Sequence, residues 1–142
     1  MQAVLTKSEA VAFLDDVFPQ IRGLFELADV RDGAVSMRLS PKDEHLRPGN
    51  TVSGPTMFGL VDVAAYVAVL THVGREALAV TTHCSIDFMN KPAADEDIVA
   101  EAALLKLGRS LAVIDVKLYP QGRDRILAAA NVTYSIPPKK SD

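Results

Sequence analysis

A single carboxylate stands in the middle of a long apolar stretch, SGPTMFGLVDVAAYVAVLTHVG, at residues 53–74. Asp62 is the only formally charged residue in this stretch. On a helix its neighbours one turn away are Phe58 and Tyr66, so Asp62 does not belong to a polar face. Burying an ionised group is costly, and a carboxylate can act as a general base or as a nucleophile. Asp62 is therefore the first candidate for catalysis.

The stretch around Asp62 has the end signals of a helix. Ser53 is a good N-cap residue, Pro55 suits a first turn and Gly74 favours a helix end, which predicts a helix from about Gly54 to Gly74. An amphipathic helix would place Asp62 in water, but its polar face should hold more than one charged residue. A membrane-spanning helix is disfavoured, because Asp62 would lie near its centre and the stretch has no basic flanks. We favour a helix buried on nearly all sides.

The composition is typical of one soluble globular domain, which we expect to span residues 1–142. The formal charge of −3 argues against nucleic-acid binding. Glu9, Asp15 and Asp16 interrupt the apolar segment that a signal peptide would need. The single cysteine, Cys84, has no partner for an intrachain disulfide. We expect a cytoplasmic protein that binds neither nucleic acid nor a membrane.

Other segments predict a short helix and six strands. Alternation, turn signals and proline stops place the helix at Lys7–Phe18 and the strands at Leu24–Val30, Ala34–Leu39, Ala79–Met89, Ile98–Leu107, Leu111–Tyr119 and Ile126–Ile136, before a tail at 137–142. The polar segment Ser40–Val52 is expected to be a loop that leads into the long helix. Strands that follow one another without helices form an antiparallel sheet. The predicted fold class is α+β, with this sheet wrapped around one long central helix.

The strand Ala79–Met89 alternates between two kinds of side chain. We expect one face to carry Val80, Cys84, Ile86 and Phe88, and the other to carry Thr81, His83, Ser85 and Asp87. Such a strand belongs to a sheet with one wet side or to an oligomer contact. Cys84 is interpreted as a small buried hydrophobic residue.

From about Leu24 to Ile136 the order of elements resembles the hotdog fold, and within it the acyl-CoA thioesterases related to the phenylacetate-pathway thioesterase. The family motif is His, any residue, Asn, two residues, Gly, two residues, His-Gly-Gly, and an acidic residue nine positions after the second His. The corresponding window is HLRPGNTVSGPTMFGLVD. It matches the motif at His45, Gly54 and Asp62, and departs from it at Arg47 for Asn, Asn50 for Gly, Ser53 for His and Pro55 for the second Gly.

The resemblance implies hydrolysis of a small or medium acyl-CoA, aromatic acyl groups included. The backbone amide of Gly54 would polarise the thioester carbonyl, and Asp62 would act as general base or nucleophile. Asp62 lies about 12 Å beyond Gly54 along the same helix axis, too far to act on the carbonyl group that Gly54 binds. In the family, Gly54 of one protomer is paired with Asp62 of another. A homodimer or homotetramer is therefore implied. No cofactor is implied, because coenzyme A is part of the substrate.

Six further residues are candidates for substrate binding: Arg47, Asn50, Ser53, Thr81, Thr82 and Arg109. Arg47 is either a ligand contact or a surface charge of the loop. Asn50 reaches the pocket or serves a turn. A small hydroxyl residue near Thr81 and Thr82 holds the attacking water in family members, although strand propensity also explains both threonines. Arg109 would meet the phosphates of coenzyme A, or is simply solvated.

Rival functions remain open at this point. A non-hydrolytic acyl-CoA binding protein would keep the pocket, and the departures at Arg47 and Ser53 favour it slightly. A hydratase of the same fold would need a spaced Asp and His pair, which the sequence lacks. A metal enzyme is disfavoured because His72 and His83 have no ligand spacing with Cys, Asp or Glu, and a nucleotide-dependent enzyme because no glycine-rich phosphate loop is present.

Overall fold

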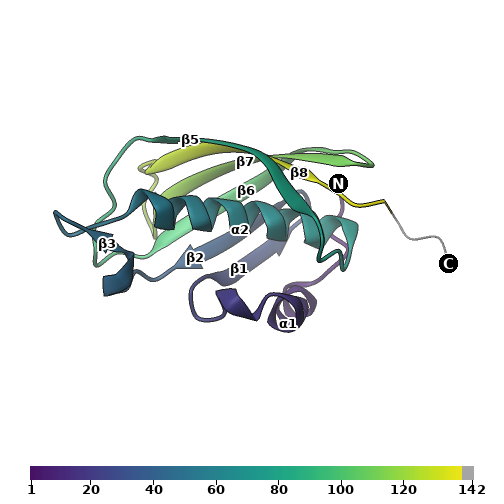
Figure 1. Ribbon diagram of the computed structural model, residues 1–142, viewed down its shortest axis with the longest axis horizontal. Coiled ribbons are helices and arrows are strands. Elements are labelled where there is room, and N and C mark those ends of the chain that lie inside the picture. Colours follow the sequence, from purple (N-terminus) through teal and green to yellow (C-terminus); the bar gives the residue numbers. More distant parts are fainter. Residues whose placement is uncertain (139–142) are drawn as a thin grey trace.

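The computed structural model describes residues 1–138, and the expected tail at 137–142 therefore lies largely outside the described residues. Within residues 1–138, two α-helices and eight strands follow one another, with 3-10 turns at Pro19–Ile21 and Asp43–His45 (Figure 1). Their bounds are α1 Lys7–Val17, β1 Glu26–Arg31, β2 Ala34–Leu39, β3 Leu46–Arg47, β4 Thr51–Val52, α2 Gly54–Val73, β5 Val80–Phe88, β6 Ile98–Leu107, β7 Leu111–Pro120 and β8 Ala128–Ser135.

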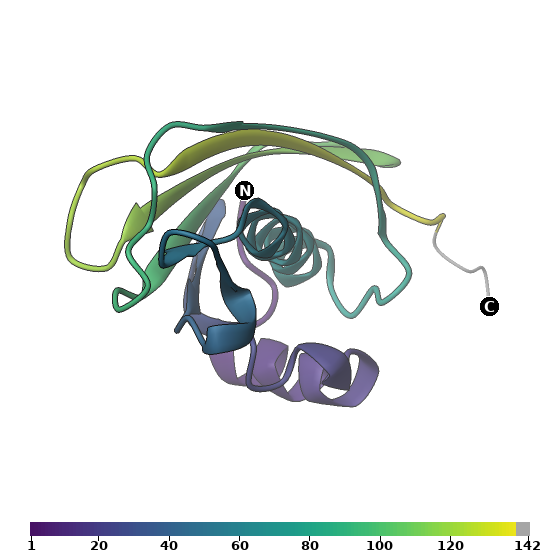
Figure 2. The same cartoon turned by 60° about the vertical axis from the view of Figure 1, so that its left-hand side comes forward.

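Six of the strands form one antiparallel sheet in the order β1-β2-β6-β7-β8-β5. The sheet curves over α2, and α1 lies on the far side of that helix, next to β1 (Figure 2). Strands β1 and β5 are the two edges of the sheet. The predicted fold class, an antiparallel sheet wrapped around one long central helix, is confirmed.

Most of helix α2 is buried by the sheet and α1, which accounts for its long apolar sequence. Its side chains from Val63 to His72 are all buried, and 72% of a window long and apolar enough to span a membrane lies inside the molecule. Ser53 caps the first turn by accepting from the N–H of Thr56. The N–H of Gly74 closes the last turn on the carbonyl of Leu70. The buried interpretation of this helix is confirmed.

The segment Ser40–Val52 is more ordered than the predicted loop. It contains a short 3-10 turn at Asp43–His45 and a small hairpin made by β3 and β4. At the hairpin tip Gly49 and Asn50 both have positive φ angles, 97° and 57°. Glycine and asparagine favour this left-handed backbone. Because both residues are also typical of loops, the sequence predicted a loop for the whole segment.

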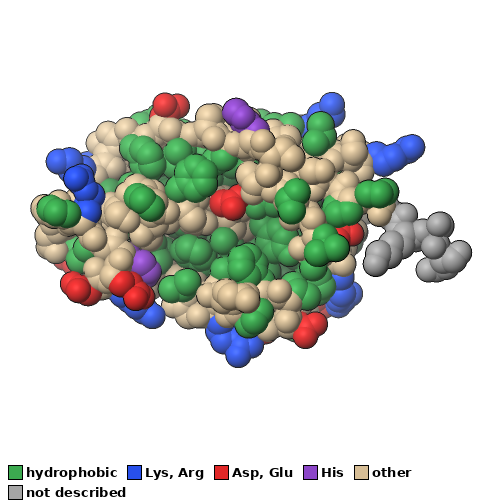
Figure 3. All heavy atoms as spheres, in the orientation of Figure 1, with side chains coloured by type: hydrophobic (Ala, Val, Ile, Leu, Met, Phe, Trp, Pro, Cys, Tyr) green, Lys and Arg blue, Asp and Glu red, His purple; other side chains and the backbone are tan. Residues whose placement is uncertain are grey.

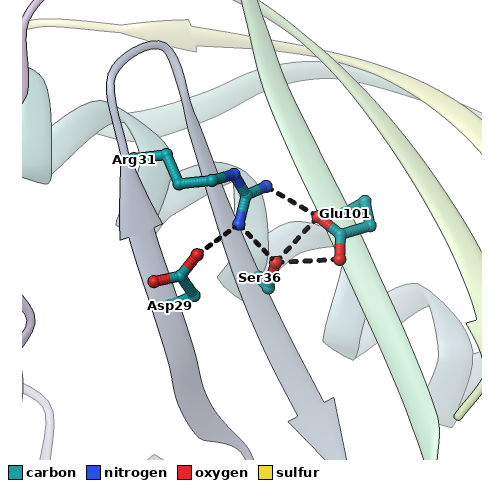
Figure 4. A network of polar contacts seen from close by, with 4 residues as sticks. All are labelled: Asp29, Arg31, Ser36 and Glu101. Atoms are coloured by element: carbon teal, nitrogen blue, oxygen red, sulfur yellow. Dashed lines mark hydrogen bonds and ion pairs between the residues drawn. The ribbon is translucent and has the colours of Figure 1, made fainter. Parts of the chain in front are cut away.

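A polar network joins three strands, β1, β2 and β6 (Figure 4). The guanidinium of Arg31 donates to Asp29 at 2.7 Å, to the hydroxyl of Ser36 at 2.9 Å and to Glu101 at 2.8 Å. The hydrogen bond from Arg31 lowers the pKa of Asp29. Since Arg31, Asp29 and Glu101 are about half exposed, this network helps to fix the pairing of the strands more than it adds stability.

A buried histidine ties the end of α2 to the β1–β2 hairpin. The Nε2 atom of His72 accepts from the N–H of Gly33 at 2.8 Å, and Nδ1 lies 2.8 Å from the carbonyl oxygen of Ala68. Because Nε2 is an acceptor, the ring is neutral and its proton is on Nδ1. The ring therefore links two elements that are distant in sequence.

We expect His72→Phe to lower the free energy of unfolding by about 1 to 3 kcal/mol, because it leaves the N–H of Gly33 without a partner. Urea denaturation measures this change. His72→Gln, whose side-chain oxygen can still accept, should lose less. Equal stability of wild type and His72→Phe would show that the link contributes nothing.

Candidate active site

Asp62 is half-buried on α2, and one of its oxygens is tied to the sheet. Its Oδ1 atom accepts from the hydroxyl of Thr81 at 2.5 Å and from the hydroxyl of Tyr134 at 2.9 Å. Within residues 1–138 no donor contacts Oδ2. The carboxylate is thus held through one oxygen and left open at the other.

Thr81 reaches Asp62 because of a β-bulge, and this corrects the predicted face of β5. Thr81 pairs with Tyr134, but His83 pairs with Thr133, so Thr82 is the extra residue. The bulge reverses the alternation of the strand. Thr81 consequently faces α2 with the half-buried Cys84, and not the opposite side with His83 as regular alternation predicted.

Tyr134 was not among the residues singled out in the sequence. It lies on β8, is 3% exposed, and its hydroxyl also lies 3.0 Å from the backbone oxygen of Asp62. Burial raises the pKa of Tyr134, so the hydroxyl keeps its proton and remains a donor. It falls within the predicted strand Ile126–Ile136, but no sequence signal connected it to Asp62.

Asp62 lines a pocket of about 370 Å³ together with its two donors, Thr81 and Tyr134. The pocket is lined by side chains from α1, α2, β5 and β8 and the segment between α2 and β5, among them Phe18, Val63, Tyr66 and Val80. Phe18 packs edge-on against Tyr66 with ring centroids 5.9 Å apart. The carboxylate therefore meets a space whose walls are partly aromatic and whose lining is both polar and apolar.

Gly54 lies in a different pocket, of about 450 Å³, at the other end of the fold. Arg47 from β3 and Phe88 from β5 line the same pocket. The N–H of Gly54 is in the first turn of α2, where it has no acceptor within residues 1–138. An unpaired amide at a helix N-terminus is a ready donor for developing negative charge.

The remaining predicted residues are not brought together. Ser53 uses its hydroxyl on the N–H and hydroxyl of Thr56, and so caps the helix. Asn50 is exposed at the β3–β4 hairpin tip and serves the turn. Thr82 points its hydroxyl at the carbonyl of Thr133, 3.3 Å away. Arg109 is exposed in the β6–β7 turn, at the end of the molecule opposite β3 (Figure 1).

Hydrophobic side chains are exposed along β5 and near α2. Large apolar side chains gather on the face of the molecule that carries these two elements (Figure 3). They include Phe58, Leu78, Val80, Phe88 and Met89, each at least 40% exposed. Strand β5 is also an edge of the sheet, with one row of backbone groups unpaired. An apolar face beside an open strand edge is typical of an interaction surface.

No group of three or more His, Cys, Asp or Glu side chains that could hold a metal ion occurs within residues 1–138. The chemistry that the described site offers is that of a carboxylate, two hydroxyl groups and a helix N-terminus.

This combination of sheet, helix and site has known counterparts. The family model of the thioesterase superfamily matches residues 49–127. Human acyl-coenzyme A thioesterase 13 is 28% identical over 116 residues, which are 82% of each chain. The crystal structure of a candidate thioesterase from Silicibacter sp. TM1040 has a TM-score of 0.90 and 51% identity, over 97% of this chain and 96% of that one. The E. coli PaaI protein shares the fold, with a TM-score of 0.79 and 18% identity over 92% and 93% of the two chains.

These similarities define a hotdog-fold thioester hydrolase, as the sequence predicted. The chain belongs to the thioesterase superfamily.

Proposed function

We propose that the protein hydrolyses small or medium acyl-CoA thioesters, aromatic ones included, at a site shared by two protomers. The observation that carries this proposal is the state of Asp62, a carboxylate that lines a pocket and has hydrogen-bond donors on one of its two oxygens. The similarity to human acyl-coenzyme A thioesterase 13 supports coenzyme A as the thiol part of the substrate.

Two protomers are needed because the two chemical groups lie in separate pockets of one chain. Gly54 and Asp62 are about 12 Å apart along α2, too far to serve one carbonyl group. Strand β5 offers an open edge and exposed Val80 and Phe88, and each of the two pockets has one of these residues in its lining. Pairing two β5 edges would extend the sheet and bring Asp62 of one protomer towards Gly54 of the other.

In the proposed reaction the thioester oxygen accepts a hydrogen bond from the N–H of Gly54. The dipole of α2 favours the negative charge that develops on this oxygen as the carbonyl carbon is attacked. Asp62 either takes a proton from the attacking water or attacks the carbon itself. If Asp62 takes the proton, hydroxide adds to the carbonyl carbon, the C–S bond breaks and the proton passes from Asp62 to the thiolate of coenzyme A. If Asp62 attacks, the C–S bond breaks to give a mixed anhydride and the thiolate, and water then hydrolyses the anhydride, which releases the acid and supplies the proton of the thiol.

The lining of the pocket beside Asp62 supports an acyl group as its occupant. Phe18, Tyr66 and Val80 offer aromatic and apolar contacts there. Arg47 lines the Gly54 pocket and could contact the coenzyme A part of the substrate.

Release of free coenzyme A from acetyl, medium-chain, long-chain and aromatic acyl-CoA thioesters tests this function. We expect turnover of at least one short, medium or aromatic thioester and weaker turnover of the long-chain one. A folded protein that binds acyl-CoA without releasing coenzyme A would replace the proposal by the alternative of a non-hydrolytic binding protein.

A further inference from the structure

Tyr134 and Thr81 reach Asp62 as a cross-strand pair. They are direct partners in the β5–β8 register, and the bulge at Thr82 turns Thr81 to the side on which Tyr134 lies. Both hydroxyl groups end on the same oxygen, Oδ1 of Asp62. Two donors on one oxygen restrict rotation of the carboxylate about its last bond and leave Oδ2 without a donor.

The ring of Tyr134 is itself held by aromatic packing. It lies 6.1 Å from the ring of Tyr66, which packs in turn on Phe18 at the end of α1. The hydroxyl has one proton and two acceptors, Oδ1 and the backbone oxygen of Asp62, at 2.9 Å and 3.0 Å. Of these the charged carboxylate is the stronger acceptor. Burial keeps the proton on the phenol by raising the pKa of Tyr134.

We propose that Tyr134 is a positioning residue, which together with Thr81 fixes Asp62 so that Oδ2 alone faces the water or the thioester carbon. This inference rests on the proposed function, since Asp62 is taken as the reacting group. Tyr134 also lines the pocket beside Asp62, and the role proposed for its hydroxyl is to orient Asp62. A loosely held carboxylate would spend less time in the reactive geometry, which lowers kcat without weakening substrate binding.

The test compares Tyr134→Phe with Tyr119→Phe. The first variant keeps the ring and removes the donor to Asp62, and we expect kcat to fall about tenfold with KM within about twofold of wild type. Tyr119 lies on β7, where it alternates with the buried Leu118 and is in neither proposed pocket. Tyr119→Phe should therefore keep wild-type kcat. Melting temperatures establish that rates refer to folded enzyme.

Thr81→Val and the double variant separate positioning from a general effect on stability. If both donors fix one oxygen, losing either one frees the carboxylate, and the double variant should lose much less kcat than the product of the two single losses. Losses that multiply, or a Tyr134→Phe variant with wild-type kcat, would overturn the inference while leaving the proposed function in place. A wild-type protein that hydrolyses no thioester would overturn both.

Discussion

Asp62→Asn is expected to lower kcat for thioester hydrolysis by about 10²- to 10⁴-fold. Asparagine has nearly the shape of aspartate, and its side-chain oxygen can still accept from Thr81 and Tyr134. It replaces Oδ2 by an amide group that neither takes a proton from water nor attacks a carbonyl carbon. The loss should therefore be chemical, with KM changed little.

The matched control is Asp115→Asn. Asp115 lies on β7, where its carboxylate contacts Lys117 at 2.7 Å and is in neither pocket. The Asp115→Asn substitution removes the same charge but lies outside the site, so kcat should stay at the wild-type level. Steady-state rates compare kcat of the two variants with wild type, and circular dichroism shows whether both variants are folded. An Asp62→Asn enzyme with wild-type kcat would exclude Asp62 as base and as nucleophile.

Gly54→Pro is expected to cost about 10²- to 10³-fold in kcat, because proline has no N–H to donate to the thioester oxygen. The change suits the local backbone in two respects. Proline is favoured in the first turn of a helix, and Ser53 before it has the extended backbone, ψ 152°, that a residue preceding proline prefers.

Gly54→Ala separates the missing donor from the added bulk. A Cβ at this position would lie 3.5 Å from its nearest neighbour, the ring of Phe88, which is ordinary van der Waals contact. The alanine variant keeps the N–H and should retain most of the activity. Equal losses in the alanine and proline variants would point to blocked space in the pocket and not to a lost donor.

The two inactive variants also test the shared site. A mixed dimer of Asp62→Asn and Gly54→Pro would contain one site with both groups intact and one with neither. Random assortment makes about half of the dimers mixed, so mixing the unfolded variants and refolding them should restore about a quarter of wild-type activity. A site contained within one protomer would give no recovery.

The sequence predicted the framework closely because its signals are local. Ser53 and Gly74 marked both ends of α2, and the Asp-Gly pair at 32 and 33 marked the β1–β2 turn. The six strands of the main sheet lie within two residues of their predicted bounds at every end. Caps, turns and alternation depend on neighbours in the chain, and these neighbours are visible in one sequence.

The candidate site was only partly predictable, because its contacts are between distant segments. Asp62 was identified as a charged residue in a helix that has no polar face, and Gly54 was identified from the family motif. The bulge at Thr82 has no local signature, so Thr81 was placed on the wrong face of β5. The contact of Tyr134 with Asp62 joins β8 to α2 and exists only after the sheet has closed.

The apolar character of α2 has a consequence for biosynthesis. Four of the strands that pack on this helix, β5 to β8, follow it in the chain. At usual translation rates roughly 3 to 12 s pass between completion of α2 and completion of β8. During this interval the nascent chain exposes an apolar helix that would satisfy the length and hydropathy of a membrane span. The helix that organises the native core is thus the segment with the greatest need of shielding on the ribosome.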